Sequence, residues 1–207
     1  MSFDRQALWS SAEEARRLGR SRKAIAGYER ILAVNPDDVS VHAKLAPLLA
    51  KRRRFDAALS SFLLAATDYA ERGFLDRALG VYLHATKYLP RQSGLWASIA
   101  DLHMERDRRA DAVAALLEGS RSLTGKKHRG QGIDLLRRAL EINPLATEVA
   151  LPLARLLHKE GQRKEAVLLL ASLSTQVTKK KRRSVCWTLF RLSPSPKHFW
   201  RWVTARG

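Results

Sequence analysis

The sequence has little of three features that mark particular protein classes: cysteine, long apolar runs and strand patterns. Cys186 is its one cysteine, so no disulfide can form within the chain. The longest apolar run, AVLLLASL, is much shorter than the roughly 20 residues needed to cross a bilayer. Alternation of apolar and polar residues, typical of strands, is nearly absent. Because the opening residues MSFDRQALWSS lack the charged-then-apolar layout of a secretory signal, we expect a cytoplasmic protein.

Patterns typical of catalysis or metal binding are also missing. The six histidines are scattered, with no pair at the i, i+4 spacing of a helical zinc site. The stretch LTGKKHRGQG has the composition of a phosphate-binding loop but not its GxxxxGK[ST] order, and we interpret it as a flexible turn. Basic neighbours would lower the pKa of the Cys186 thiol, but no histidine partner is evident, which favours a plain buried cysteine. We therefore expect no enzyme activity, no cofactor, no metal and no small-molecule substrate.

What the chain does contain is a repeated pattern of helix-forming segments. Prolines and two sets of alanines recur at a constant interval of 54 residues: Pro36, Pro90 and Pro144; Ala46, Ala100 and Ala154; Ala58, Ala112 and Ala166. Each interval has room for three helices and their turns. Gly19 and Gly73 are expected directly after helices, and the prolines shortly before the next ones. The core is expected to include both alanine sets together with Tyr28, Phe62, Tyr82 and Trp96.

These repeated residues resemble the pattern of the tetratricopeptide repeat (TPR) family, a right-handed stack of helical hairpins. The matching sets are Ala24, Tyr28, Ile31 and Pro36; Ala78, Tyr82, Ala85 and Pro90; Gly132, Leu136, Ala139 and Pro144; and Trp96, Ile99, Ala100, Ala112 and Leu116. The resemblance implies an all-α, right-handed superhelical array of antiparallel helices in residues 1–177, with about ten repeat helices and a C-terminal capping helix. An interval of 54 residues is longer than one unit of about 34 and shorter than two. Which helices pair as hairpins therefore stays open.

The resemblance also implies a function, since TPR proteins bind partners in a concave groove lined by their first helices. By register, the candidate groove residues are Gln6, Trp9, Glu13, Arg16, Leu63, Thr67, Ala97, Asp101, Met104, Leu117, Arg121, Leu151, Arg155 and His158. These positions could equally be plain packing sites. The lysine and asparagines with which some family members hold a carboxylate terminus are absent from them. We predict a protein–protein interaction adaptor without that clamp.

Positive charge dominates the sequence, with a formal net charge of +18. If the helices run up and down in alternation, the turns after odd-numbered helices share one edge, which we call the basic edge. Its residues are Arg20, Arg22, Lys23, Lys51, Arg52, Arg53, Arg54, Lys126, Lys127, Arg129, Arg163 and Lys164. The opposite edge carries more acidic than basic residues. The basic edge is either a solvated face or a docking surface for an acidic protein, a phosphate-rich ligand or nucleic acid.

The last segment, residues 178–207, forms a separate basic and tryptophan-rich extension. No acidic residue follows Glu165. The basic tail comprises Lys179, Lys180, Lys181, Arg182 and Arg183. An apolar helical face follows, and after SPSP comes a short amphipathic segment with Phe199, Trp200 and Trp202. We favour a capping helix with a folded-back extension, while nucleic acid or an anionic membrane surface remains an alternative partner for the basic edge and tail.

Overall fold

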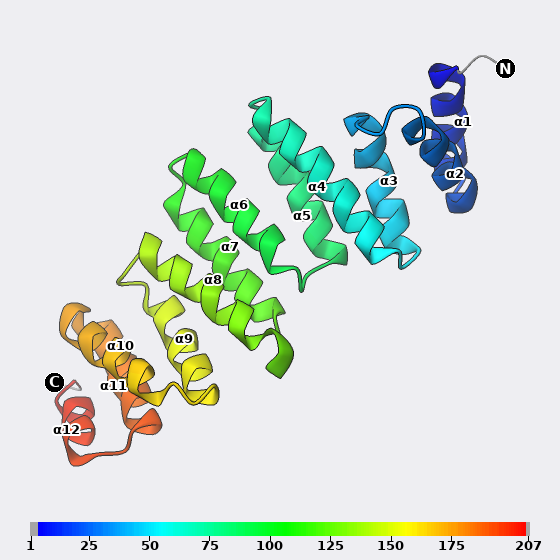
Figure 1. The fold of residues 1–207 in the computed structure, drawn as a ribbon. Helices are drawn as coiled ribbons and strands as arrows, with labels where there is room; N and C mark the ends of the chain where they lie inside the picture. The colour runs from blue at the N-terminus through cyan, green and yellow to red at the C-terminus, as the bar shows by residue number, and fades with distance from the viewer. Residues whose placement is uncertain (1–3, 206–207) are drawn as a thin grey trace. The chain divides into compact units, whose positions relative to one another are not determined.

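The computed structural model describes residues 4–205, and no strand occurs among them (Figure 1). The elements are α1 (Arg5–Arg17), α2 (Ser21–Leu32), α3 (Val39–Lys51), α4 (Phe55–Glu71), α5 (Leu75–Tyr88), α6 (Ser93–Glu105), α7 (Arg109–Ser122), the 3-10 turn η1 (Lys126–His128), α8 (Arg129–Ile142), α9 (Thr147–Lys159), α10 (Arg163–Gln176), α11 (Lys179–Leu192) and α12 (Pro196–Thr204). The predicted all-α class and the ten repeat helices, α1 to α10, are confirmed.

The interval seen in the sequence corresponds to three helices. α2, α5 and α8 begin at Ser21, Leu75 and Arg129, which lie 54 residues apart. The same interval separates the starts of α3, α6 and α9, and those of α4, α7 and α10. Local turn chemistry thus repeats with a period of three helices, although helical hairpins have a period of two.

The turns repeat their backbone geometry at the same interval. Gly19 and Gly73 follow α1 and α4 with φ of +70° and +77°, as predicted for residues that end helices in the left-handed region. A second set, Arg53, Asp107 and Gly161, has φ of +60°, +53° and +81°. Two members of this set are not glycine, so the position is recognisable from the interval but not from residue type. The three repeated prolines precede α3, α6 and α9, as expected.

The helices form two compact units, which divide between Leu102 and His103 within α6. In the first unit α1 packs against α2 and α3 packs against α4, while α4 also packs against α5 and α3 reaches α5. The sequence did not decide whether α4 pairs with the helix before it or with the helix after it, and the structure shows that it packs against both α3 and α5. In the second unit consecutive helices from α7 to α12 pack against each other, and α9 also contacts α11. The predicted boundary at residues 177 and 178 stays a prediction.

The core is built around the repeated alanines. All six, Ala46, Ala100, Ala154, Ala58, Ala112 and Ala166, are completely buried. Tyr28, Phe62 and Tyr82 are buried as predicted. A small side chain at these sites allows the helix backbones to approach closely, and the larger side chains fill the space beside them.

Trp96 is half-buried, so it is less enclosed than Tyr28, Phe62 and Tyr82. Its indole Nε1–H donates a hydrogen bond to the Pro90 carbonyl, at 2.8 Å, which holds the ring at the start of α6. At the same point one interval earlier, His42 Nε2 lies 2.7 Å from the Pro36 carbonyl. The ring at this position therefore ties the first turn of a helix to the loop before it.

The apolar face of α11 covers the preceding helices. Val185, Cys186 and Leu189 are buried, and α11 contacts both α9 and α10, as expected of a capping helix. Burial raises the pKa of the Cys186 thiol, although Arg201 and Arg182 act in the opposite direction. The basic neighbours thus lower this pKa as expected, but burial outweighs them, and the interpretation as a buried structural cysteine is supported.

Two helical glycines should respond oppositely to alanine because their surroundings differ. A Cβ on Gly27 would lie 2.9 Å from the Cβ of Ala12, which is too close, whereas a Cβ on Gly80 would meet nothing within 4 Å. We expect Gly80→Ala to raise the free energy of unfolding by about 0.5–1 kcal/mol through reduced backbone entropy of the unfolded chain. Gly27→Ala should lower it by about 1–3 kcal/mol through overpacking. Urea denaturation of both variants measures the difference, and equal effects would contradict the close contact of α1 and α2.

Candidate ligand-binding clefts

Three alternate helices of the first unit contribute to one open cleft of about 460 Å³, which we call the first-unit cleft. It is lined by Trp9 from α1; Ser40, Ala43 and Lys44 from α3; Tyr69 from the end of α4; and Arg77, Gly80, Val81 and His84 from α5. The α3 and α5 residues follow i, i+3, i+4 and i+7 spacing, so each set lies on one face of its helix. The cleft is thus a continuous surface across α1, α3 and α5.

Contacts on two sides hold Trp9 in place. Its ring meets that of Tyr28 edge to face, with 5.7 Å between centroids. The Arg5 guanidinium lies 5.5 Å from the ring centroid and also forms an ion pair with Asp38 at 2.6 Å. Asp38 in turn caps α3 through the Val41 backbone N–H. These contacts tie the aromatic wall of the cleft to both α1 and α3.

A second network below Trp9 centres on Glu13. Arg16 lies 2.8 Å from a Glu13 oxygen, and the Tyr28 hydroxyl donates a hydrogen bond to the same carboxylate. Hydrogen bonds from Arg16 and Tyr28 lower the pKa of Glu13 from its ordinary 4.5 to about 2, against burial, which acts to raise it. Burial, followed by the Glu13 contact, raises the pKa of the Tyr28 phenol. Glu13 is therefore ionised and fully engaged at neutral pH.

The stability of the protein should depend on pH through Glu13. Because its pKa is lower in the folded state, the carboxylate contributes stability that is complete above pH 4.5 and lost as the pH falls toward about 2. We expect Glu13→Gln to cost about 2 kcal/mol at neutral pH and much less at the acidic end of that window. Denaturation of both proteins across the window tests this. A cost that stays constant with pH would show that the carboxylate charge is not what stabilises the α1–α2 pair.

The charge of the first-unit cleft is positive. Among residues 4–205 no carboxylate forms an ion pair with Lys44 or Arg77. The Arg77 guanidinium instead lies 5.1 Å and 6.0 Å from the ring centroids of Phe74 and Tyr69. Burial lowers the pKa of His84, which leaves this side chain neutral at pH 7. Two cations therefore stand beside aromatic and aliphatic surface in the cleft.

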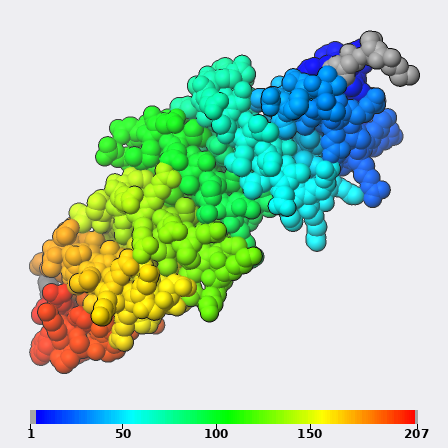
Figure 2. All heavy atoms as spheres, in the orientation of Figure 1, coloured from blue at the N-terminus to red at the C-terminus, as the bar shows by residue number. Residues whose placement is uncertain are grey.

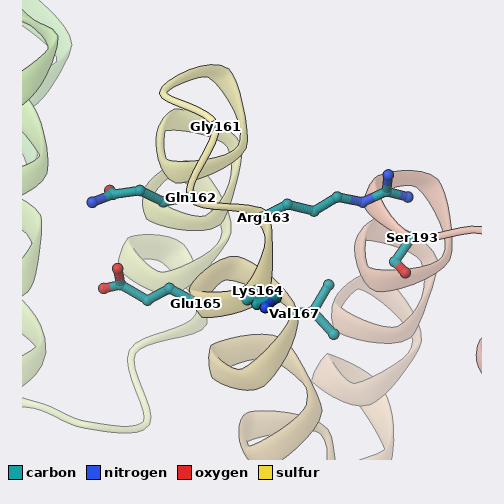
Figure 3. A pocket seen from close by; sticks show the side chains of 7 residues that line it. All are labelled: Gly161, Gln162, Arg163, Lys164, Glu165, Val167 and Ser193. Carbon is teal, nitrogen blue, oxygen red and sulfur yellow. The ribbon is translucent and has the colours of Figure 1, made fainter.

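Two clefts of the second unit lie between α11 and the preceding helices α9 and α10, and both are basic. The α10–α11 cleft, about 730 Å³, lies between the start of α10 and Ser193. In Figure 3, Arg163 extends from α10 toward Ser193, whereas Gln162 and Glu165 point the other way. Glu165 forms an ion pair with Arg137 at 2.9 Å, so it does not neutralise Arg163. The α9–α11 cleft, about 350 Å³, is lined by Arg155, His158, Lys159, Thr188, Arg191 and Leu192.

The candidate groove residues lie on different surfaces. Trp9 lines the first-unit cleft, and Arg155 and His158 line the α9–α11 cleft. Glu13 and Arg16 belong to the network below Trp9. Leu117 is buried. The remaining candidates are exposed or half-buried on α1, α4, α6, α7 and α9 and line none of these clefts: Gln6, Leu63, Thr67, Ala97, Asp101, Met104, Arg121 and Leu151.

The sequence did not identify Lys44, Arg77 and His84 as cleft residues, and the reason is the length of the interval. Three helices separate matched positions, so a shift by one interval moves from an odd-numbered helix to an even-numbered one. Within the first unit the odd helices α1, α3 and α5 supply every cleft residue except Tyr69, whereas Leu63 and Thr67 lie on α4 outside the cleft. A shift of two helices, about 36 residues, would have led from α3 to α5 and to Arg77.

Residues of the basic edge are exposed in both units, apart from Arg129, which is half-buried. Arg129 lies 2.7 Å from Glu160 and 3.1 Å from the Lys159 carbonyl, so the turns before α8 and after α9 meet. Lys126, Lys127 and Arg163 belong to these two turns. Arg54 in the first unit forms an ion pair with Glu29 at 2.7 Å. Most of the other basic-edge charges have no such partner among residues 4–205.

This chain is similar to solved helical-repeat structures. No family model matches the sequence, and no curated protein does. Yeast Tom70 is 14% identical, with 91% of this chain and 40% of that chain covered and a TM-score of 0.40. A kinesin light chain from Podospora anserina with TPR-like repeats is 16% identical, with coverage of 97% and 89% and a TM-score of 0.39. MamA is 13% identical, with coverage of 98% and 91% and a TM-score of 0.31.

Among residues 4–205, no cluster of three or more histidine, cysteine, aspartate or glutamate side chains is arranged to hold a metal ion. None of the helices described is both long enough and apolar enough to span a membrane.

Proposed function

We propose that the chain is a non-enzymatic protein-binding scaffold, and that its first-unit cleft receives an acidic segment of a protein partner. The observation that carries this proposal is the lining of that cleft, where Lys44 and Arg77 flank Trp9 and Val81 without a paired carboxylate. A partner segment with carboxylates next to an aliphatic side chain matches both the two cations and the apolar side chains of the cleft. Charged hydrogen bonds to such carboxylates contribute about 1.5–3 kcal/mol each.

The basic edge has a different role in this proposal. Its side chains are exposed, and exposed charges add little to the affinity of a bound state because solvent screens them. They do raise the local concentration of an acidic partner and so accelerate association, within a Debye length of roughly 8 Å at physiological salt. We assign the edge to steering and the cleft to retention of the partner.

A matched pair of peptides tests the binding of an acidic segment. One fluorescein-labelled peptide alternates leucine with glutamate, and the other alternates leucine with glutamine. We expect the intact protein to bind the glutamate peptide at least tenfold more tightly in fluorescence anisotropy, with an advantage that shrinks as salt is added. Equal affinity for the two peptides would contradict the proposal, since the cleft would then select for apolar surface alone.

A further inference from the structure

The C-terminal helices expose a cluster of aromatic side chains that the proposed protein-binding clefts do not use. Trp187 and Phe190 of α11 meet Trp202 and Phe199 of α12, and Phe199 also meets Trp200, with ring centroids between 5.0 and 6.4 Å apart. Trp187 and Phe199 are each 42% exposed, and Trp200 is 63% exposed. No residue of α12 is buried. In Figure 2 the atoms of α12, in red, lie directly beside those of α11.

The surroundings of this aromatic cluster are basic. No acidic residue follows Glu165 in the sequence. Lys180, Arg183 and Ser184 form a shallow cleft of about 330 Å³ with Trp187 and Trp202, and Lys197 is exposed on α12. Glu148 of α9 lies 4.0 Å from Lys181 of α11. Basic side chains thus surround the exposed tryptophans.

We propose that α11 and α12 form a peripheral docking surface for anionic lipid bilayers. Tryptophan is favoured at the headgroup level, where an amphipathic ring meets both apolar and polar surroundings, and basic side chains around it attract lipid phosphates and carboxylates. The short α12 lies with its aromatic side chains in the interface, and Lys180, Arg183 and Lys197 contact the lipid headgroups. The partner is a membrane surface bearing negative charge.

Charge and ring geometry disfavour two other occupants of this surface. A second copy of the chain would bring two sets of lysines and arginines of like charge together, since a two-fold interface uses the same patch twice. Single-stranded nucleic acid binds along a groove with aromatic side chains spaced for successive bases, whereas these five rings pack against one another in one cluster. A bilayer requires neither opposite charge on a second copy nor rings spaced along a groove.

Vesicle binding by the intact protein tests the proposal. We expect sedimentation with vesicles of equal parts phosphatidylcholine and phosphatidylserine, a blue shift of tryptophan fluorescence, and at least tenfold weaker binding to phosphatidylcholine alone. The double variant Phe199→Ser/Trp200→Ser should reduce binding at least tenfold. Its matched control is Leu168→Ser, because Leu168 is 70% exposed on α10 outside the cluster.

Two charge-reversal variants distinguish attraction of vesicles by the α11–α12 surface from attraction by the overall positive charge of the protein. Lys180→Glu/Arg183→Glu should weaken vesicle binding about tenfold or more, whereas Lys126→Glu/Lys127→Glu, which changes the net charge equally, should weaken it much less. An absence of vesicle binding, or equal losses in the two charge variants, would overturn the proposal. Tighter binding to single-stranded RNA that is lost in the aromatic variant would also overturn it. So would self-association without vesicles that the aromatic variant abolishes. Binding of the glutamate peptide is measured in parallel and should stay unchanged in all the α11 and α12 variants.

Discussion

The variant Ala100→Asp is expected to lose about 4 kcal/mol of unfolding free energy, the largest effect of any single substitution considered. Ala100 is completely buried, as are Ala46 and Ala154 at the matched positions. A carboxylate there would have neither water nor a partner to replace its hydration, and there is no space for its volume in a close-packed seam. The expected outcome is a protein that is largely unfolded or that melts far below the wild type.

The control for this substitution is Ala114→Asp. Ala114 is exposed on α7, so aspartate there should cost no more than about 0.5–1 kcal/mol, from its lower helix propensity. Urea denaturation followed by circular dichroism compares the two variants. Similar losses in both would mean that the repeated alanines do not form the packed seams from which the fold was derived.

The architecture was largely readable from the sequence because its signals are local. Glycine in the left-handed region, proline before a helix and alanine in a seam each act within a few residues. The positions of Gly19, Pro36 and Ala46 therefore predicted turns, helix starts and core correctly. The hydrogen bond from Trp96 to the Pro90 carbonyl was not predicted, because it depends on how a loop folds back over the first turn of α6.

The clefts were harder to predict because they depend on which helices become neighbours. No motif in the sequence links Lys44 with Arg77. The repeat interval matched Trp9 of α1 with positions on α4, whereas the cleft places Trp9 with residues of α3 and α5. Cys186 shows a similar limit, since basic residues in the sequence say nothing of burial, which controls the pKa of its thiol. Packing decides which helices contact each other, and a single sequence carries this information only indirectly.

Reversing the charge of the first-unit cleft should weaken binding of the glutamate peptide by roughly 100-fold, chiefly through faster dissociation. Lys44→Glu/Arg77→Glu replaces two attractive charges with two repulsive ones, and each tenfold loss corresponds to about 1.4 kcal/mol. Glu13 lies close enough to be influenced by Lys44, so the melting temperature is recorded for this variant and for the milder Lys44→Gln/Arg77→Gln. A properly folded glutamine variant should still lose about tenfold in affinity.

The decisive measurement compares this cleft variant with an edge variant of equal net charge, Arg22→Glu/Lys23→Glu, by stopped-flow binding of the glutamate peptide at low and high salt. Arg22 and Lys23 are exposed at the start of α2 and do not line the cleft. The account predicts that the cleft variant dissociates much faster at both salt concentrations, whereas the edge variant associates several-fold more slowly at low salt and dissociates like the wild type. Equal affinities and equal rate constants for the two variants would contradict it, because binding would then follow overall charge and not the cleft formed by α1, α3 and α5.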